Sequence, residues 1–244
     1  MENPHASSET LGGSPYPGDP CRSAVECHAV SKTFAARNGP VRALASVSLS
    51  AGWGEALAIS GKSGAGKSTL LSLLAGLDSP TSGTVLLAGH DLGSMSNSAV
   101  ARLRREKIGL IFQDFNLLAS WTAFENVEAA LMHCGMDRAV RRERVDAILG
   151  SLGLEQRANH LPGELSVGQQ QRVAVARTLV NRPEIIFADE PSGDVDPETA
   201  HEIHRLLLEP VRTRGATLIV ATHGNFPLAL ADRALVLKDG TIAG

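Results

Sequence analysis

The sequence has few features of secreted or membrane-spanning proteins. Its three cysteines, Cys21, Cys27 and Cys134, form no CxxC pair and lack flanking histidines, so we expect free thiols in a reducing compartment rather than disulfides or a zinc site. No apolar run approaches the roughly 18 to 20 residues that cross a bilayer; the longest is 70–77. The N-terminus shows no charged start followed by an apolar core, so no export signal is predicted. Any membrane role is therefore expected to come through a partner.

The charge balance gives little sign of a nucleic-acid partner. The formal net charge is −3, which gives no sign of a nucleic-acid partner held by bulk electrostatics. A basic cluster at Arg102, Arg104, Arg105 and Lys107 keeps such a role open, but charged helix faces are usually just solvated. We expect no nucleic-acid partner. A chain of 244 residues can form one large or two small domains with a proper core.

Patterning divides the chain into a tail and an α/β region. Residues 1–23 are rich in Pro, Gly, Ser and Asn and poor in aliphatic side chains, which predicts a disordered tail. From Val25 onward, short apolar runs alternate with amphipathic stretches, which is typical of α/β proteins. Buried parallel strands are predicted at 57–60, 108–112, 185–189 and 218–222. Helices are predicted at 66–75, 98–106, 139–152, 167–180 and 198–212, and the segment 121–165 is expected to be an inserted helical subdomain.

A phosphate-binding loop follows the first of these strands. The run after Ser60 fits GxxxxGK(S/T) in a strand–loop–helix setting, where backbone amides and a helix N-terminus can hold phosphates. Lys67 is expected to reach the β- and γ-phosphates and Ser68 to hold Mg²⁺, while Thr69 is expected to add a supporting hydrogen bond. A plain glycine-rich turn would not need Lys followed by Ser here. The loop consists of Gly61, Lys62, Ser63, Gly64, Ala65, Gly66, Lys67, Ser68 and Thr69.

Two acids end the strand 185–189. Asp189 is positioned to hold Mg²⁺ through a water, and Glu190 to orient or deprotonate the water that attacks the γ-phosphate. Taken alone, these acids would more simply form a solvated turn before Pro191. Together with a phosphate loop, they indicate a nucleotide-hydrolysing site.

A third motif lies between the first two and makes a family resemblance specific. Residues 165–172, Leu-Ser-Val-Gly-Gln-Gln-Gln-Arg, resemble the signature of ATP-binding-cassette (ABC) transporter ATPases, usually LSGGQ followed by QQR. Ser166 and the amides of Gly168 and Gln169 would offer an anion a hydroxyl and N–H groups. An ordinary serine helix cap is the alternative, but it does not explain the order of the three motifs.

The resemblance covers the chain from about Val25 to its end. It implies an α/β fold of the P-loop NTPase, ABC type: a mainly parallel core sheet with flanking helices, an N-terminal antiparallel β subdomain and an inserted helical subdomain. The ATPase domain would span 24–244, with the helical subdomain at about 121–165. The implied activity is Mg²⁺-dependent ATP hydrolysis, with ATP and Mg²⁺ as ligands.

Further positions match the family's site. Phe34 would stack on adenine, or else be a core residue, and Gln113 would touch Mg²⁺ and the attacking water. Asp196, after Asp194, would be a dimer contact or simply a helix cap before Pro197. His223 would contact the γ-phosphate. The resemblance thus implies catalytic roles for Lys67, Gln113, Glu190 and His223, and metal contacts for Ser68, Gln113 and Asp189.

Three departures from the family pattern leave the phosphoryl chemistry intact. Val167 replaces a signature glycine, Phe34 replaces the usual Tyr, and the segment 193–196 is an unusual dimer loop. The segments Phe-Gln-Asp-Phe-Asn-Leu-Leu, Glu-Asn-Val and Leu-Pro-Gly-Glu-Leu-Ser are most similar to the lipoprotein-release, macrolide-export and cell-division group of these ATPases.

The resemblance implies a head-to-tail homodimer, or pseudo-symmetric pair, with ATP between Lys67 of one subunit and Ser166 of the other. A groove near Gln113, Leu117, Trp121 and Phe124 would pass motion to integral membrane permease subunits, unless these side chains merely fill the subdomain core. The protein is then expected to be cytoplasmic, on the inner face of the membrane. Alternatives are a soluble ABC ATPase acting on nucleic acid or ribosomes, a phosphate-loop kinase, and a non-catalytic cassette, which the intact Glu190 disfavours.

Overall fold

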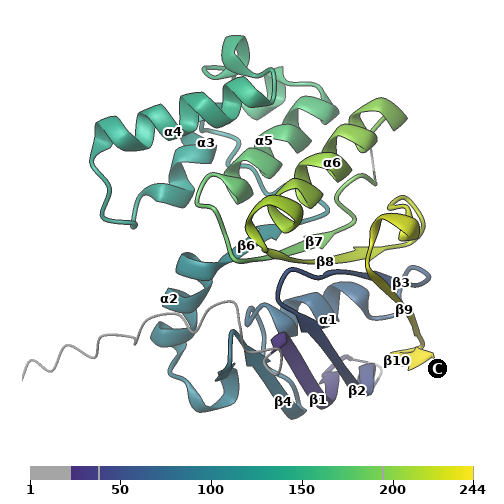
Figure 1. Ribbon diagram of the computed structural model, residues 1–244. Coiled ribbons are helices and arrows are strands. Elements are labelled where there is room, and N and C mark those ends of the chain that lie inside the picture. Colours follow the sequence, from purple (N-terminus) through teal and green to yellow (C-terminus); the bar gives the residue numbers. More distant parts are fainter. Residues whose placement is uncertain (1–22, 38, 194, 244) are drawn as a thin grey trace, which may run out of the picture.

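The computed structural model describes residues 23–37, 39–193 and 195–243. These residues form two β-sheets and two groups of helices (Figure 1). The expected tail, apart from Ser23, lies outside the described residues. Within the described ranges, no helix combines the length and apolar character needed to cross a membrane.

The smaller sheet is antiparallel and comes mainly from the N-terminal part of the chain. It contains β1 (Ser23–Phe34), β2 (Val41–Gly52), β4 (Ser82–Leu87) and β5 (His90–Asp91) in the order β2-β1-β4-β5. In β2, the buried residues Val47, Leu49 and Ala51 alternate with exposed ones, because successive side chains of a strand point to opposite faces. The N-terminal antiparallel β subdomain expected from the resemblance is therefore present.

The larger sheet is mainly parallel and has the order β10-β9-β3-β8-β7-β6. Its strands are β3 (Ala56–Ser60), β6 (Ile108–Ile111), β7 (Ile185–Asp189), β8 (Thr217–Thr222), β9 (Arg233–Lys238) and β10 (Thr241–Ala243). Only β10 is antiparallel to its neighbour. All predicted strands are found, with ends shifted by a single residue at most.

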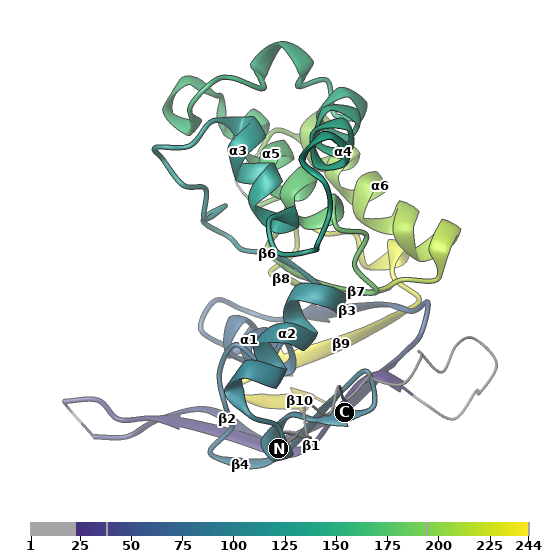
Figure 2. The same cartoon turned by 90° about the vertical axis from the view of Figure 1, so that its left-hand side faces the viewer.

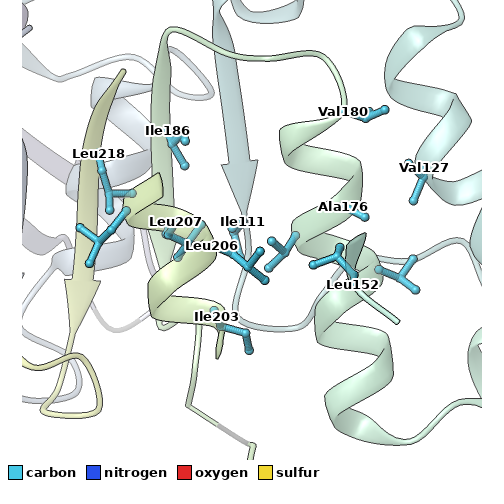
Figure 3. Packing of buried hydrophobic residues seen from close by; sticks show 14 of the residues in the cluster. Ile111, Val127, Leu152, Ala176, Val180, Ile186, Ile203, Leu206, Leu207 and Leu218 are labelled. Carbon is cyan, nitrogen blue, oxygen red and sulfur yellow. The ribbon is translucent and has the colours of Figure 1, made fainter. Parts of the chain in front are cut away.

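The parallel sheet separates two hydrophobic cores. On β7, Ile186 and Ala188 face the core beneath the later helices, while Ile185 and Phe187 face the core shared with the antiparallel sheet. Figure 3 shows the first core, with Ile186 and Leu218 of the sheet opposite side chains from several helices. Because both faces of these strands are buried, they are continuous apolar runs in the sequence.

Helices cover both faces of the parallel sheet. The helices are α1 (Lys67–Leu74), α2 (Asn97–Lys107), α3 (Ala123–Glu128), α4 (Arg138–Ser151), α5 (Val167–Leu179) and α6 (Pro197–Arg214). The short 3-10 turns are η1 (Leu92–Ser94), η2 (Ala129–Leu131), η3 (Glu155–Arg157), η4 (Pro162–Glu164) and η5 (Leu228–Leu230). The starts of α2, α5 and α6 are fixed by the side-chain caps Ser96, Ser166 and Asp196.

The segment between β6 and α5 is helical, as its pattern predicts. Its helices α3 and α4 pack with α5 around a core that includes Leu131, Val145 and Leu149 (Figure 2). A capping box between Thr122 and Glu125 begins α3. This helical group lies above the sheets in both views, on the side of the parallel sheet that α6 also covers.

Candidate functional site

The glycine loop joins β3 to α1 at the carboxyl edge of the parallel sheet. Gly61 N donates to Thr222 O at 3.2 Å, and Ala65 N donates to Lys62 O at 3.1 Å. Gly66 caps α1 with φ 102°, and a Cβ there would lie 2.6 Å from Ala43 O, so only glycine fits. The first amides of a helix lack intrahelical acceptors and carry the positive end of its dipole. The loop therefore presents N–H groups suited to an anion.

Lys67 is folded into this loop. Only 7% of the residue is exposed, and its Nζ donates to Gly61 O at 2.9 Å and to Lys62 O at 3.3 Å. The same ammonium lies 3.5 Å from Glu190 Oε1. Its charge is thus held next to the loop amides, where an anion would enter.

Ser68 and Asp189 meet beside Lys67. The Ser68 hydroxyl hydrogen-bonds to the carboxylate of Asp189, whose Oδ1 is buried and has no hydrogen-bond partner. Burial raises the pKa of Asp189, and the charge of Glu190 raises it further, while the Ser68 bond and Lys67 act in the opposite direction. A hydroxyl and a spare carboxylate oxygen are donors that Mg²⁺ accepts. The residues present therefore fit this ion.

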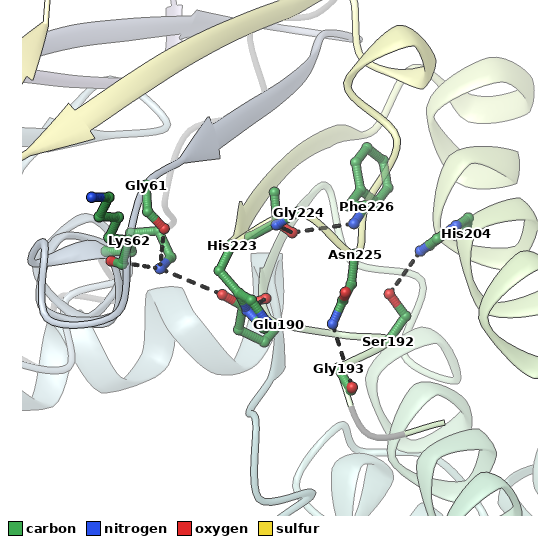
Figure 4. A network of polar contacts seen from close by, with 12 residues as sticks. Gly61, Lys62, Glu190, Ser192, Gly193, His204, His223, Gly224, Asn225 and Phe226 are labelled. Carbon is green, nitrogen blue, oxygen red and sulfur yellow. Dashed lines mark hydrogen bonds and ion pairs between the residues drawn. The ribbon is translucent and has the colours of Figure 1, made fainter. Parts of the chain in front are cut away.

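Glu190 lies at the end of β7 in a strained conformation. Its φ is 48°, the left-handed region that non-glycine residues rarely adopt, and its amide donates to Ala221 O at 3.0 Å. Oε2 of this buried carboxylate lies 2.8 Å from Nδ1 of His223, which is half exposed. The structure thus brings Lys67, Glu190 and His223 together, and Figure 4 shows the last two side by side. Such strain at a polar cluster is common at functional sites.

The signature residues occupy the start of α5. Ser166 Oγ accepts from Gln169 N at 3.3 Å, and Gln169 Oε1 accepts from Ser166 N at 3.0 Å, which is a capping box. The neighbouring Val167 is 47% exposed, so its side chain does not fill the core. At Gly168 a Cβ would lie 3.3 Å from the Thr199 side chain, so α5 and α6 approach closely here.

The structure does not bring the signature and the glycine loop together within one chain. Helices α1 and α5 belong to different cores, on opposite faces of the parallel sheet (Figure 1). Across the residues that the structure describes, no hydrogen bond or ion pair joins Ser166, Gly168 or Gln169 to residues 61–69.

The remaining site positions are only partly brought together. Phe34 ends β1 with 42% of its surface exposed and Lys32 Nζ 5.1 Å from its ring centroid, so it is not a core residue. Gln113 is exposed and lies beyond the end of β6 rather than in the strand. Asp196 caps α6, accepting from Glu198 N at 3.1 Å and Thr199 N at 3.0 Å. Bonds to Thr199 lower the pKa of Asp196; Asp194 lies outside the described residues.

Sequence reasoning missed the residues that shape the loop around His223. Thr222 Oγ1 accepts from the amides of Gly224 and Phe226, both at 3.1 Å, and Asn225 Nδ2 donates to Gly193 O at 3.3 Å. A threonine at a strand end and an asparagine in a loop are ordinary turn residues. Their partners become visible only when β7 and β8 are paired.

A phosphate-binding loop after β3, a lysine inside it and acids at the end of β7, beyond β8 in the same sheet, define a P-loop nucleotide hydrolase. A protein-family model described as ABC transporter matches residues 44–193. The chain is also similar to the macrolide export ATP-binding/permease protein MacB of Rhodospirillum rubrum, at 44% identity over 218 residues, and of Burkholderia pseudomallei, at 44% over 215 residues. Each alignment covers 89% or 88% of this chain but 33% of the relative, so the chain spans about a third of their length.

Solved structures agree with these sequence matches. The dimeric structure of MJ0796, a bacterial ABC transporter cassette, superposes with a TM-score of 0.86 at 39% identity, covering 90% of this chain and 97% of that one. Clostridium perfringens cbiO1, part of the ABC transporter complex cbiONQ, gives a TM-score of 0.77 at 30% identity, covering 91% and 87%. The chain belongs to the ABC transporter family and is an ATPase cassette of that family. Both the resemblance and the fold class predicted from the sequence are confirmed.

Proposed function

We propose that this chain is the ATP-driven subunit of an export-type or lipoprotein-release-type ABC transporter, which pairs around Mg-ATP and drives a separate membrane permease. The observation that carries the proposal is the cluster of Lys67, Glu190 and His223 at the mouth of the glycine loop. It places a cation, a base and a second hydrogen-bonding group where a γ-phosphate would end.

The glycine loop and Lys67 would hold the β- and γ-phosphates of ATP. The amides of residues 61–69 supply donors, and the Lys67 ammonium supplies positive charge once an anion displaces its backbone carbonyl partners. The exposed ring of Phe34 would stack on adenine, which requires only an accessible aromatic face.

Ser68, Asp189 and Gln113 would hold Mg²⁺. Of these, Ser68 and Asp189 already lie in contact, and the unpartnered Oδ1 of Asp189 is the strongest sign that a cation belongs there. When bound, Mg²⁺ neutralises charge on the phosphates. Gln113 is exposed on the segment that leads from β6 to the helical group, so it can approach once nucleotide is in place.

Glu190 would act as the base for the attacking water. Its carboxylate would take a proton from the water as the water oxygen bonds to the γ-phosphorus, while the bond from that phosphorus to the bridging oxygen breaks and its electron pair leaves with ADP. His223, 2.8 Å from Glu190 Oε2, would orient this carboxylate and contact the γ-phosphate. The carboxylate of Glu190, whose φ is 48°, lies 3.5 Å from the Lys67 ammonium of the loop.

Two chains would complete each site. Since α1 and α5 lie on opposite faces of the sheet and belong to different cores, Ser166, Gly168 and Gln169 would meet the γ-phosphate held by another subunit's glycine loop. MJ0796 is dimeric, including in a post-hydrolysis state with ADP and Pi. Asp196, at the start of α6, would lie near the contact between subunits. The same arrangement in this chain makes ATP part of the dimer interface.

A cavity of about 420 Å³ between α2, β6, η2 and α5 is the proposed docking site for the permease. Apolar residues such as Leu110, Phe112 and Ala130 line it, and Arg104, Arg105 and Arg177 give it positive charge. It would receive a short cytoplasmic segment of the permease that carries an acidic side chain. The relatives named ATP-binding/permease proteins support such a partner, since this chain matches about a third of the length of each. The chain would then lie on the cytoplasmic face of the membrane.

This cavity differs from the groove expected from the sequence. Leu117 and Phe124 pack against the helical core cluster, as the alternative interpretation held, while Phe112 and Asn116 line the cavity. The basic cluster of α2 is partly used inside the chain: Arg104 donates to Gly76 O at 2.5 Å, and Lys107 pairs with Glu184 at 3.0 Å. These contacts weaken the alternative of a nucleic-acid-directed ATPase.

Release of phosphate from ATP by the purified chain, with and without Mg²⁺, tests the proposal. Turnover that requires Mg²⁺ and disappears in Lys67→Ala is expected. For the partner, charge reversal at Arg105, an exposed residue of the cavity rim, should reduce co-purification of an integral membrane protein from membranes while leaving ATP binding unchanged. An equal yield of that membrane protein with the wild type and with the Arg105 variant would count against this docking site.

A further inference from the structure

A histidine lies in the apolar face of α6. His204 is only 4% exposed, and the adjacent positions Ile203 and Leu207 are fully buried. Burial lowers the pKa of His204, and the nearby His201 lowers it further, so its imidazole is neutral around pH 7. A neutral imidazole in such surroundings is unfavourable unless it is hydrogen-bonded.

Its hydrogen-bond partner is Ser192. The Ser192 hydroxyl lies 2.8 Å from His204 Nε2, and Ser192 is itself 4% exposed (Figure 4). Ser192 belongs to the loop that leaves β7, between Glu190 and Asp196. Helix α6 therefore contacts this loop at two points: Asp196 caps the start of the helix, and His204 holds Ser192 in the middle of the loop.

The same imidazole contacts the loop that leaves β8. Its ring meets the ring of Phe226 edge-on, with centroids 4.9 Å apart and planes at 71°. Phe226 is 2% exposed, and its amide donates to Thr222 Oγ1 at 3.1 Å. Asn225 of this loop donates to Gly193 O at 3.3 Å, a second bond between the two loops. His204 is thus packed against both loops, each of which carries one member of the Glu190–His223 pair.

We propose that His204 is a positioning residue, which locks the segment 190–193 to the loop 222–226 through Ser192 and Phe226 and so holds Glu190 against His223. Glu190 has an unfavourable left-handed backbone, which persists only where its surroundings fix it. The Ser192 bond, two residues further on, is such a fixation. The inference rests on the proposed hydrolysis at Glu190. It assigns His204 and Ser192 an indirect role, through the position of Glu190.

A role in stability alone is the competing explanation, and a double variant separates the two. Ser192→Ala or His204→Leu leaves one buried polar group without its partner, which lowers the melting temperature. The double variant Ser192→Ala/His204→Leu removes both polar groups, so its melting temperature should return toward that of the wild type. His201→Leu makes the same change at an exposed position of the same helix and is the matched control.

The expected result is a loss of turnover that does not follow stability. Both single variants and the double variant should lower kcat by about tenfold, because a misplaced base slows the chemical step. The dissociation constant of a fluorescent ATP analogue should change by less than about twofold in each, since the phosphate loop is untouched. Ser192→Thr, which keeps the hydroxyl, should retain most of the wild-type kcat, and His201→Leu should retain all of it.

Recovery of wild-type kcat in the double variant, together with its melting temperature, would overturn the proposal and leave His204 a stability role only. Unchanged kcat in all three variants would also overturn it. Failure of the proposed function would look different: the wild-type chain itself would release no phosphate from ATP, and Glu190→Gln would match it.

Discussion

The ammonium of Lys67 lies 3.5 Å from Oε1 of Glu190, and both side chains are almost fully buried. The two charges form an ion pair, and the lysine also donates to two backbone carbonyls of the glycine loop. An entering γ-phosphate competes with Glu190 for this ammonium.

This pairing predicts that Lys67→Ala lowers stability as well as activity. Removing one member of a buried ion pair leaves the other uncompensated, which costs roughly 3 to 5 kcal/mol when no other partner remains. Because Glu190 keeps His223 as a neighbour, we expect the low end of that range. Urea denaturation without nucleotide measures the effect, and the double variant Lys67→Met/Glu190→Gln should recover part of the loss. A midpoint equal to the wild type in Lys67→Ala would contradict the pairing.

Asp189→Asn should stabilise the nucleotide-free protein while abolishing Mg²⁺-dependent turnover. Burial and the charge of Glu190 raise the pKa of Asp189 in the folded state. As the pH rises, the unfolded chain loses this proton before the folded chain does. Ionisation of Asp189 therefore lowers the stability of the folded protein most at neutral pH, and has no such effect well below its ordinary pKa. We expect a melting temperature higher by roughly 2 to 4 °C at pH 7, the shift that about 1 kcal/mol gives in a domain of this size.

The matching control is the same pair of proteins at acid pH. The difference in melting temperature should shrink as the pH falls toward 4, because Asp189 then becomes protonated in the unfolded chain as well as in the folded one. A lower melting temperature for Asp189→Asn at pH 7 would show that the Ser68 hydrogen bond outweighs burial of the charge.

Val167→Gly should change the ATPase rate by less than about tenfold. The side chain of Val167 is 47% exposed, while the capping hydroxyl belongs to Ser166, so valine leaves the donors of the helix start available. Glycine would raise the entropy cost of ordering the helix start by roughly 0.5 to 1 kcal/mol, but it would also allow closer approach of a partner's nucleotide. Opposing free-energy changes near 1 kcal/mol cannot change the rate by more than about tenfold.

Ser166→Arg is the contrasting variant at the neighbouring position. A long cation at this exposed helix start would block a second subunit's glycine loop sterically, so cooperative hydrolysis should be lost. Steady-state rates of both variants, measured over a range of protein concentrations, test the assignment. Activity that appears only in Val167→Gly would mean that the wild-type signature needs a different partner subunit.

How much the sequence predicts depends on how local the signal is. Strands β3, β7 and β8 are buried on both faces and are therefore visible as apolar runs. Strand β9 contains the apolar run 234–237 but buries only Leu237, and it went unpredicted, as did the bounds of β1 and β2. The caps Ser166 and Asp196 lie where the helix starts were predicted, because capping is a matter of adjacent residues.

The site divides in the same way. The glycine loop and the acids of β7 are contiguous motifs, so Lys67, Ser68, Asp189 and Glu190 could be named from the sequence. The Ser192–His204–Phe226 contacts join residues from separate elements, and a histidine within an amphipathic helix gives no sign of its partner. Gln113 was expected at a strand end, whereas β6 ends at Ile111 and its position depends on the loop that follows.

The most direct test of the account is the mass of Glu190→Gln with and without Mg-ATP, measured by light scattering alongside phosphate release. Without its base, the variant should hydrolyse ATP roughly 10²-fold more slowly or worse, yet bind it normally. ATP should then persist between the glycine loop of one chain and Ser166 of another, and the account predicts a monomer without nucleotide and a dimer with it. A single unchanged mass under both conditions, or wild-type turnover, would contradict it.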